Sequence, residues 1–293
     1  MMLNKNVLMS GVDYFDDQAA INPFMDSLVP IDRVAAAVEH AAIKQALEDA
    51  GVTVHQVKPP IDCQDGVYTA NWALCRGDKA VLATLPPARE AEEAYAKEVL
   101  ESFGKTVYKV PNDWHFSGQG DALPCGNYLF AGSGYRTDPR AHKFLADTLG
   151  YEVITLRTKP QRTWFGVPVT NVSSGWPDSF FYDIDLALSV LIPPENGQKG
   201  LIAWCPNAFT PASRKKLQKF DKVDKIEVSF EEARQAFACN LVSTGRTVIM
   251  GDGAPLLKAI LEGRGFTVIT PHIRELAKGG GYIRCTTLTL DNA

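Results

Sequence analysis

The chain has 293 residues, of which 45% are hydrophobic and 22% charged, with a formal net charge of -4. This composition is ordinary for a globular protein, and it leaves no excess of Lys and Arg that would favour nucleic acid or an anionic membrane surface. No stretch reaches membrane-spanning length, and the N-terminal segment lacks the apolar run of a signal peptide. We therefore expect a cytoplasmic protein that binds neither nucleic acid nor membrane.

Six cysteines are scattered along the chain without a C-x-x-C pair: Cys63, Cys75, Cys125, Cys205, Cys239 and Cys285. In a chain of this length the pattern argues against a disulfide framework and against a zinc site, so no metal is predicted. Most of these cysteines should be reduced and buried as small hydrophobic side chains. At most one should be chemically active.

The first predicted elements are a strand at 5–9, a loop over a site at 11–25, a helix at 31–50 and a strand at 52–57. The helix has the spacing of an amphipathic helix. Its predicted apolar side consists of Val34, Ala35, Val38, Ala42 and Leu47. Gly51 ends the helix as a C-terminal cap.

From residue 66 onward, two strands joined by a turn, then a helix, then another strand recur four times. The paired strands fall at 66–83, 121–132, 183–204 and 238–251. The helices fall at 91–103, 140–149, 211–219 and 254–262, and the following strands at 105–110, 151–156, 225–230 and 266–270. Such a repeat is typical of propellers and solenoids. The last segment, 282–290, should close the array by pairing with the first strand.

The comparable position of each unit carries a polar residue near its first strand. These residues are Asn71, Asp121, Asp185, Asn240 and Cys285. In a closed array they would converge on one central cavity. The run KGGG precedes Cys285 by a few residues, and glycine lets a ligand or another backbone approach closely. The pattern therefore favours Cys285 as the one functional cysteine.

With these residues in view, the sequence resembles the guanidine-modifying pentein superfamily. The resemblance extends over most of the chain and rests on YFDDQAAINPFM, DGVYTANWAL, PAREAEE, GQGDAL, FAGSGYRTD, FYDIDLAL, FACNL and GGGYIRCTTL. It implies a single domain over residues 1–293, folded as a five-bladed, pseudo-symmetric α/β propeller. The motifs INPFM and TAN are most similar to the arginine dihydrolase and dimethylarginine dimethylaminohydrolase branch.

The resemblance also implies a reaction without a cofactor. Cys285 would attack the planar carbon of a guanidino or ureido small molecule, an amine would leave, and water would release the product from a covalent thiouronium-type intermediate. Carboxylates suit the planar fork of guanidinium donors, and Arg suits a substrate carboxylate. The positions implied to bind substrate are Asp65, Asp185, Asn71, Asp121, Asn22, Arg89 and Arg136. Taken one at a time, each of these residues also has a structural explanation. Asp65 could be a turn residue, Asn22 a helix or loop cap, and Arg136 one half of a surface ion pair.

Two catalytic positions depart from the pattern of the superfamily. Asp183 stands where FYHLD has a histidine, and Ser117 stands where FEGxGD has a glutamate that orients it. Asp183, two residues from Asp185 on one face, would have a raised pKa beside other carboxyls and would then transfer the proton itself. Otherwise the site binds a cation without turnover, or His115 replaces the imidazole.

The hypothesis that follows is a cysteine-dependent C–N hydrolase of an arginine-like molecule. A ligand-binding or regulatory protein without deiminase activity and an amidinotransferase are the alternatives. The protein would be a monomer or a homo-oligomer, which the sequence does not distinguish.

Overall fold

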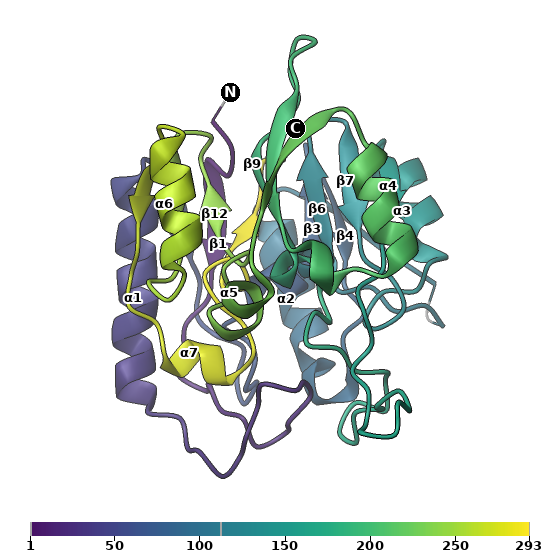
Figure 1. Ribbon diagram of the computed structural model, residues 1–293. Coiled ribbons are helices and arrows are strands. Elements are labelled where there is room, and N and C mark those ends of the chain that lie inside the picture. The colour runs from purple at the N-terminus through teal and green to yellow at the C-terminus, as the bar shows by residue number, and fades with distance from the viewer. Residues whose placement is uncertain (1, 112, 293) are drawn as a thin grey trace.

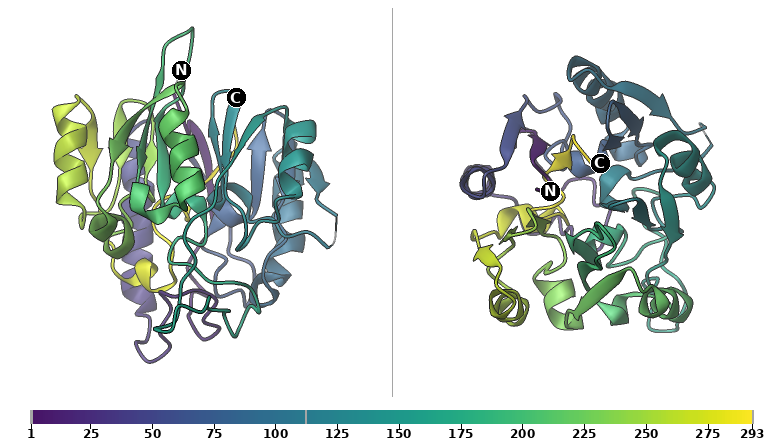
Figure 2. Two further views of the ribbon diagram at one scale, coloured as in Figure 1. Left: turned by 45° about the vertical axis from the view of Figure 1, so that its right-hand side comes forward. Right: turned by 90° about the horizontal axis from the view of Figure 1, so that it is seen from above.

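The computed structural model describes residues 2–111 and 113–292. It contains five sheets of three strands each, arranged in a ring with the helices on the outer side (Figures 1 and 2). In the view from above, the colours follow the chain once around the ring, and the last strand lies beside the first. The prediction of an α/β fold built from repeated units is thereby confirmed.

The first unit joins the two ends of the chain. Its elements are β1 (Asn6–Met9), α1 (Arg33–Asp49), β2 (Thr53–Gln56) and β15 (Leu288–Thr289). Strand β1 lies parallel to β2 on one side and antiparallel to β15 on the other, with Val7 opposite Thr289. The predicted closure of the array by the C-terminal segment is therefore confirmed.

Each of the other four units is a hairpin followed by a helix and a third strand parallel to the second. The second unit comprises η1 (Thr69–Asn71), β3 (Ala73–Arg76), β4 (Lys79–Leu82), η2 (Pro87–Arg89), α2 (Ala91–Ser102) and β5 (Thr106–Lys109). The third comprises η3 (Gly118–Gly120), β6 (Ala122–Cys125), β7 (Tyr128–Ala131), α3 (Ala141–Leu149) and β8 (Glu152–Thr155).

The fourth unit comprises η4 (Ile184–Leu186), β9 (Leu188–Ile192), β10 (Gly200–Trp204), η5 (Pro206–Ala208), α4 (Pro211–Lys219) and β11 (Val223–Glu227). The fifth comprises α5 (Phe230–Gln235), β12 (Val242–Ser243), β13 (Thr247–Ile249), α6 (Pro255–Gly263), β14 (Thr267–Ile269) and α7 (Glu275–Lys278). Short 3-10 helices precede the hairpins of the second, third and fourth units. Of these, η1 and η4 occupy part of the segments predicted as strand, while η3 lies just before the predicted strands at 121–132.

The predicted apolar side of α1 is wrong in part. Val34 is 77% exposed and Val38 66% exposed, while Ile43 and Leu47 are buried. The helix is rotated because Glu39 faces inward, where its carboxylate accepts the backbone N–H groups of residues 274–276 at the start of α7. This capping interaction stabilises α7, which the sequence did not predict.

The predicted C-terminal strand at 282–290 is also shorter than expected. Cys285 lies in a turn, and only Leu288 and Thr289 belong to β15. The Thr286 hydroxyl donates to the Ile283 carbonyl and the Thr287 hydroxyl to the Arg284 carbonyl, so local hydrogen bonds replace the strand ladder. The turn carries Cys285 to the centre of the ring. Across the ranges described, no helix combines the length and apolar character needed to cross a bilayer.

Candidate active site

The segments that precede the first strand of each unit bring their polar residues together near the centre of the ring. Asp185 lies in η4, Asn71 ends η1 and Asp121 follows η3, while Asn240 and Cys285 lie in the turns that precede β12 and β15. All five are buried. The contacts among them, described below, tie distant parts of the chain to a common site.

The Cys285 thiol is held between two side chains. It donates to Asp185 Oδ2 at 3.4 Å, and Asn240 Nδ2 donates to its Sγ at 3.1 Å. Asn240 Oδ1 also accepts the backbone N–H of Cys285 at 3.1 Å. Burial raises the pKa of the thiol well above its ordinary value, and the carboxylate of Asp185 raises that pKa further. The sulfur therefore rests as a thiol.

Asn240 was absent from the candidate site residues, although the repeat pattern had placed it at the position equivalent to Cys285. The side-chain amide of Asn240 forms hydrogen bonds with both the Sγ and the backbone N–H of Cys285, and these two contacts favour one orientation of the sulfur. The sequence pattern that could have identified Asn240 is its position in FACNL. This segment precedes β12 in the same way that the Cys285 turn precedes β15.

Asp183 and Ser117, the two positions that depart from the superfamily pattern, are joined by Asn71. Asn71 Nδ2 donates to Asp183 Oδ2 at 2.8 Å and to Ser117 Oγ at 3.0 Å. Gly120 permits this approach, because a Cβ at that position would lie 2.5 Å from Asn71 Nδ2 and 2.9 Å from Asp183 Oδ2. The three side chains form one hydrogen-bonded group.

Arg89 lies behind Asn71. Its Nη1 donates to Asn71 Oδ1 at 2.9 Å, and its Nε and Nη2 each lie 2.8 Å from a carboxylate oxygen of Glu92. Because Arg89 is only 2% exposed and already paired with Glu92, it positions Asn71. The predicted contact between Arg89 and the amino acid end of a substrate stays a prediction.

Arg136 and Asn22 fasten the loop at 10–32 to the body of the protein. Arg136 Nη2 donates to the Ile21 carbonyl at 3.1 Å, and its guanidinium lies 4.0 Å from the centre of the Tyr182 ring. Asn22 Nδ2 donates to the Gly279 carbonyl at 2.9 Å. Both predicted residues therefore lie together beside the glycine run.

Three buried carboxylate oxygens near this site have no hydrogen-bond partner among the residues that the structure describes: Asp65 Oδ1, Asp183 Oδ1 and Asp185 Oδ1. An unsatisfied buried acceptor costs roughly 1–3 kcal/mol, and more when it is charged. Their other oxygens accept from Gln64, Asn71 and Cys285 respectively. The site thus presents acceptors that a ligand with several N–H donors would satisfy.

Burial raises the pKa of four aspartates in this region, Asp65, Asp121, Asp183 and Asp185. It raises the pKa of Asp65 to about 6, and nearby Arg89 partly opposes that rise. Burial and then repulsion from Asp183 raise the pKa values of Asp121 and Asp185 well above the usual range. Burial also raises the pKa of Asp183, against the pull of Arg136. Each of these carboxyls therefore holds its proton to a higher pH than a free aspartate, and a cation beside it would favour the loss of that proton.

A metal is not favoured by the arrangement of these groups. Among the residues that the structure describes, no three His, Cys, Asp or Glu side chains are grouped so as to hold an ion. His115, the alternative imidazole, has its ring 4.1 Å from that of Trp176, and no described contact joins it to Cys285 or Asp183.

The glycine run is required by close packing around the site. A Cβ on Gly279 or Gly281 would overlap the Tyr68 side chain, whose hydroxyl donates to the Leu276 carbonyl at 2.6 Å. Gly280 has a φ of +84°, and a Cβ there would overlap the Asn22 amide. The run is thus a closely packed wall beside Cys285, as the spacing of glycines had suggested.

The fold and the site together define a member of the guanidine-modifying pentein superfamily. A family model described as N,N dimethylarginine dimethylhydrolase, eukaryotic, matches residues 14–169. The N(G),N(G)-dimethylarginine dimethylaminohydrolase of Mycobacterium tuberculosis is 32% identical over 96% of this chain and 84% of its own length. The chain belongs to the dimethylarginine dimethylaminohydrolase family.

Cyanobacterial proteins show similar identity. The bifunctional arginine dihydrolase/ornithine cyclodeaminase AgrE of Nostoc sp. is 33% identical over 96% of this chain, but the match covers 37% of that protein. The crystal structure of the N-terminal domain of ArgZ, a cyanobacterial arginine dihydrolase bound to product, matches with a TM-score of 0.82 and 30% identity, over 97% of this chain and 96% of that one. A variant of that domain is covalently bound to a reaction intermediate.

The close contact at Gly280 can be tested against a glycine of matched backbone geometry. Gly265 has a φ of +87° and nothing within 4 Å of its Cβ position. Gly265→Ala should cost about 1–2 kcal/mol of unfolding free energy from the left-handed backbone alone. Gly280→Ala should cost about 1–3 kcal/mol more, because it also displaces Asn22. Urea denaturation measures both, and equal costs would contradict the packing described.

The raised pKa of Asp65 predicts that Asp65→Asn increases the free energy of unfolding by an amount that depends on pH. The folded-state pKa of about 6 exceeds the ordinary 3.8, so the stability of the neutral carboxyl is present below pH 4 and lost as pH rises through 6. The variant should match the wild type near pH 4 and exceed it by up to about 3 kcal/mol at pH 8. Urea denaturation at both values tests this.

Asp221→Asn is the control, because Asp221 lies on the surface. A gain for Asp65→Asn that does not change between pH 4 and pH 8 would show that the buried carboxyl is not the cause.

Proposed function

We propose that the chain is a cysteine-dependent hydrolase of C–N bonds in the guanidino group of an arginine-like small molecule. The observation that carries this proposal is the set of unpartnered carboxylate oxygens of Asp65, Asp183 and Asp185 beside a buried thiol. The named activities of the Mycobacterium and cyanobacterial relatives support the same class of substrate. We further propose that residues 1–293 form one closed five-bladed propeller.

Substrate binding would relieve the electrostatic cost of the empty site. A guanidinium is a planar cation with several N–H donors, and it can satisfy more than one carboxylate at once. Its charge would stabilise the anionic forms of Asp65 and Asp185, whose pKa values burial has raised. The same charge would favour the Cys285 thiolate, so the nucleophile forms when the substrate is in place.

The chemical step then joins Cys285 Sγ to the guanidino carbon. The thiol proton passes to a neighbouring carboxylate, for which Asp185 is in contact. As the S–C bond forms, the tetrahedral intermediate expels ammonia or an amine by breaking one C–N bond. Water next attacks the thiouronium carbon, and the C–S bond breaks to regenerate the cysteine and release a ureido product.

Asp183 is the residue we assign to proton transfer. Its Oδ2 is held by Asn71, and its free Oδ1 is available to a leaving nitrogen. Because burial raises the pKa of Asp183, the carboxyl keeps its proton to a higher pH than a free aspartate, and it can donate that proton to the leaving nitrogen and later take one from the attacking water. Ser117 would act by positioning Asn71, through the hydrogen bond to Ser117 Oγ.

The reaction class is tested by supplying arginine, methylated arginines, citrulline and agmatine and following product release and intact mass. We expect ammonium or amine release with a transient adduct on Cys285. Cys285→Ala should lower turnover by roughly 10⁴–10⁶-fold and abolish the adduct. Cys63→Ser is the control, because a serine hydroxyl keeps the donor to the Ile61 carbonyl.

The non-catalytic alternative has a different outcome in the same experiment. If a compound raises the melting temperature and none is consumed, the site is a binding site and the hydrolase proposal is wrong. Transfer of the amidino group to an added amine in place of water would instead indicate an amidinotransferase. Formation of a homo-oligomer stays a prediction.

The assignment of Asp183 as the acid predicts a substrate-dependent defect. Asp183→Asn keeps an oxygen for Asn71 but removes the transferable proton, so kcat for a guanidino substrate should fall by about 10²–10⁴-fold. An isothiourea analogue that expels a thiolate needs no proton on its leaving group, and its first turnover should be much less impaired. Equal losses for both substrates would contradict the assignment.

The pair Asp183→His with Ser117→Glu restores the residues typical of the superfamily. We expect the double variant to gain or change deiminase-type activity, measured as ureido product. No change in any product would count against the placement of the site.

A further inference from the structure

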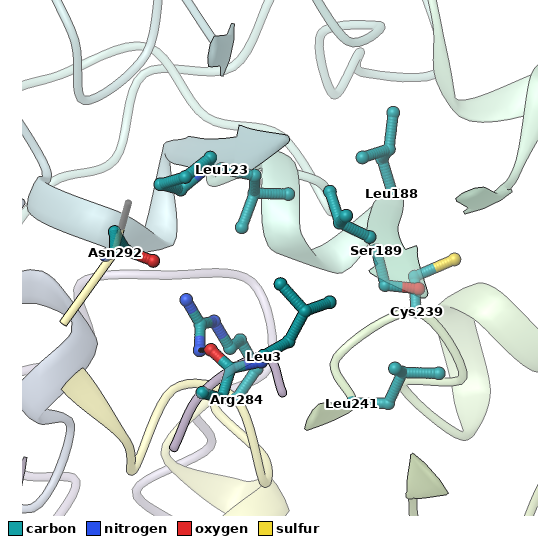
Figure 3. A pocket seen from close by; sticks show the side chains of 11 residues that line it. Leu3, Leu123, Leu188, Ser189, Cys239, Leu241, Arg284 and Asn292 are labelled. Carbon is teal, nitrogen blue, oxygen red and sulfur yellow. Dashed lines mark hydrogen bonds between the residues drawn. The ribbon is translucent and has the colours of Figure 1, made fainter. Parts of the chain in front are cut away.

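Beside Arg284, the residue before Cys285, lies a small cavity. Its volume is about 30 Å³, and both ends of the described chain contribute to its lining through Leu3, Asn4 and Asn292. Figure 3 shows the Arg284 guanidinium and Asn292 on one side of it, and Ser189 on the other, with leucines between. The cavity is thus mostly apolar with a few polar groups.

Arg284 brings a positive charge into this cavity without a direct ion pair among the described residues, and the charge of Asp185 acts on it only from a distance. The residue is 6% exposed, and its Nη1 donates to two neutral oxygens, Asn4 Oδ1 at 3.1 Å and Thr289 Oγ1 at 3.0 Å. Within the described ranges, no carboxylate lies within ion-pair distance of the guanidinium, and Nε and Nη2 donate no hydrogen bond to the protein. Buried charges in folded proteins are normally paired.

Ser189 supplies an independent sign that something is bound here. It is 4% exposed, its Oγ is buried without a hydrogen-bond partner, and it lines the same cavity from β9. A hydroxyl can donate, as a guanidinium does, so the two groups together suit an acceptor with negative charge. Space of about 10–15 Å³ holds one water, so the cavity has room for a compact ion and little more.

We propose that this cavity binds a small monovalent anion, either a halide or the carboxylate of formate, between Arg284 and Ser189. An outer groove of about 300 Å³ shares Leu3, Asn4, Pro124 and Asn292 with the cavity and gives the ion a route from the face that carries the chain ends. The anion would offset the attraction of Arg284 for Asp185 and for the Cys285 thiolate. Its binding does not depend on the hydrolase activity proposed above.

The test measures the melting temperature while chloride, bromide or formate replaces gluconate at constant ionic strength. We expect a saturable rise of about 2–4 °C for the wild type at an anion concentration well above Kd. Crystals soaked in bromide should show an anomalous peak within hydrogen-bond distance of Arg284. A larger effect of formate than of bromide would identify a carboxylate as the preferred ion, and the reverse a halide.

Three variants separate this site from general salt effects. Arg284→Gln removes the charge, Ser189→Val fills the cavity and keeps the charge, and Arg264→Gln removes an exposed charge elsewhere. The first two should lose the anion-dependent rise and the third should keep it. If Arg284→Gln fails to fold, Ser189→Val still tests the proposal, because it keeps Arg284 and should lose the anion-dependent rise in melting temperature.

Two results would overturn the proposal. One is a melting temperature that no anion changes, with water in the cavity of the soaked crystal. The other is a bromide peak without any effect in solution, which would mark an adventitious ion only.

Discussion

The burial of several carboxyls close together is the constraint on which this structure depends. Asp121, Asp183 and Asp185 lie without a directly paired cation, and burial keeps their pKa values raised. The carboxyls come from two neighbouring units of the ring. Asp121 follows η3 in the third unit, and Asp183 and Asp185 lie at η4 in the fourth. The arrangement costs stability when empty and returns it when a cation with several donors enters, which is how a binding site is prepared in advance.

The repeat could be predicted because each unit has its own local signals. Hairpin turns, helix periodicity and strand composition recur, and the pairing of β1 with β15 follows from the need to satisfy two open edges. The rotation of α1 could not be predicted, because the inward position of Glu39 depends on α7, more than two hundred residues away. The Cys285 turn was missed because threonine favours strands unless its hydroxyl bonds to the local backbone.

For the site as well, features that depend on order along the chain could be predicted, and contacts between distant segments could not. Order along the chain was enough to suggest which polar residues would meet, and the structure places Asn71, Asp183 and Ser117 in contact. It was not enough to show that Arg89 is already paired with Glu92, one helical turn later. Nor could it show that Asn240 holds the sulfur, since that contact joins two different units. The hydrogen-bond partner of a long polar side chain depends on which residues the fold places beside it, and the sequence alone does not give these neighbours.

The hydrogen bond from Cys285 to Asp185 has a consequence for the survival of the protein under oxidative conditions. Peroxides and other electrophiles react with the thiolate, and a thiol whose pKa is held high is a poor target for them. The empty site therefore shelters its sulfur from sulfenic acid formation. Under the proposed function, a bound guanidinium would lower the pKa of Cys285 while itself covering the sulfur, so the thiolate would form only when the substrate is in place.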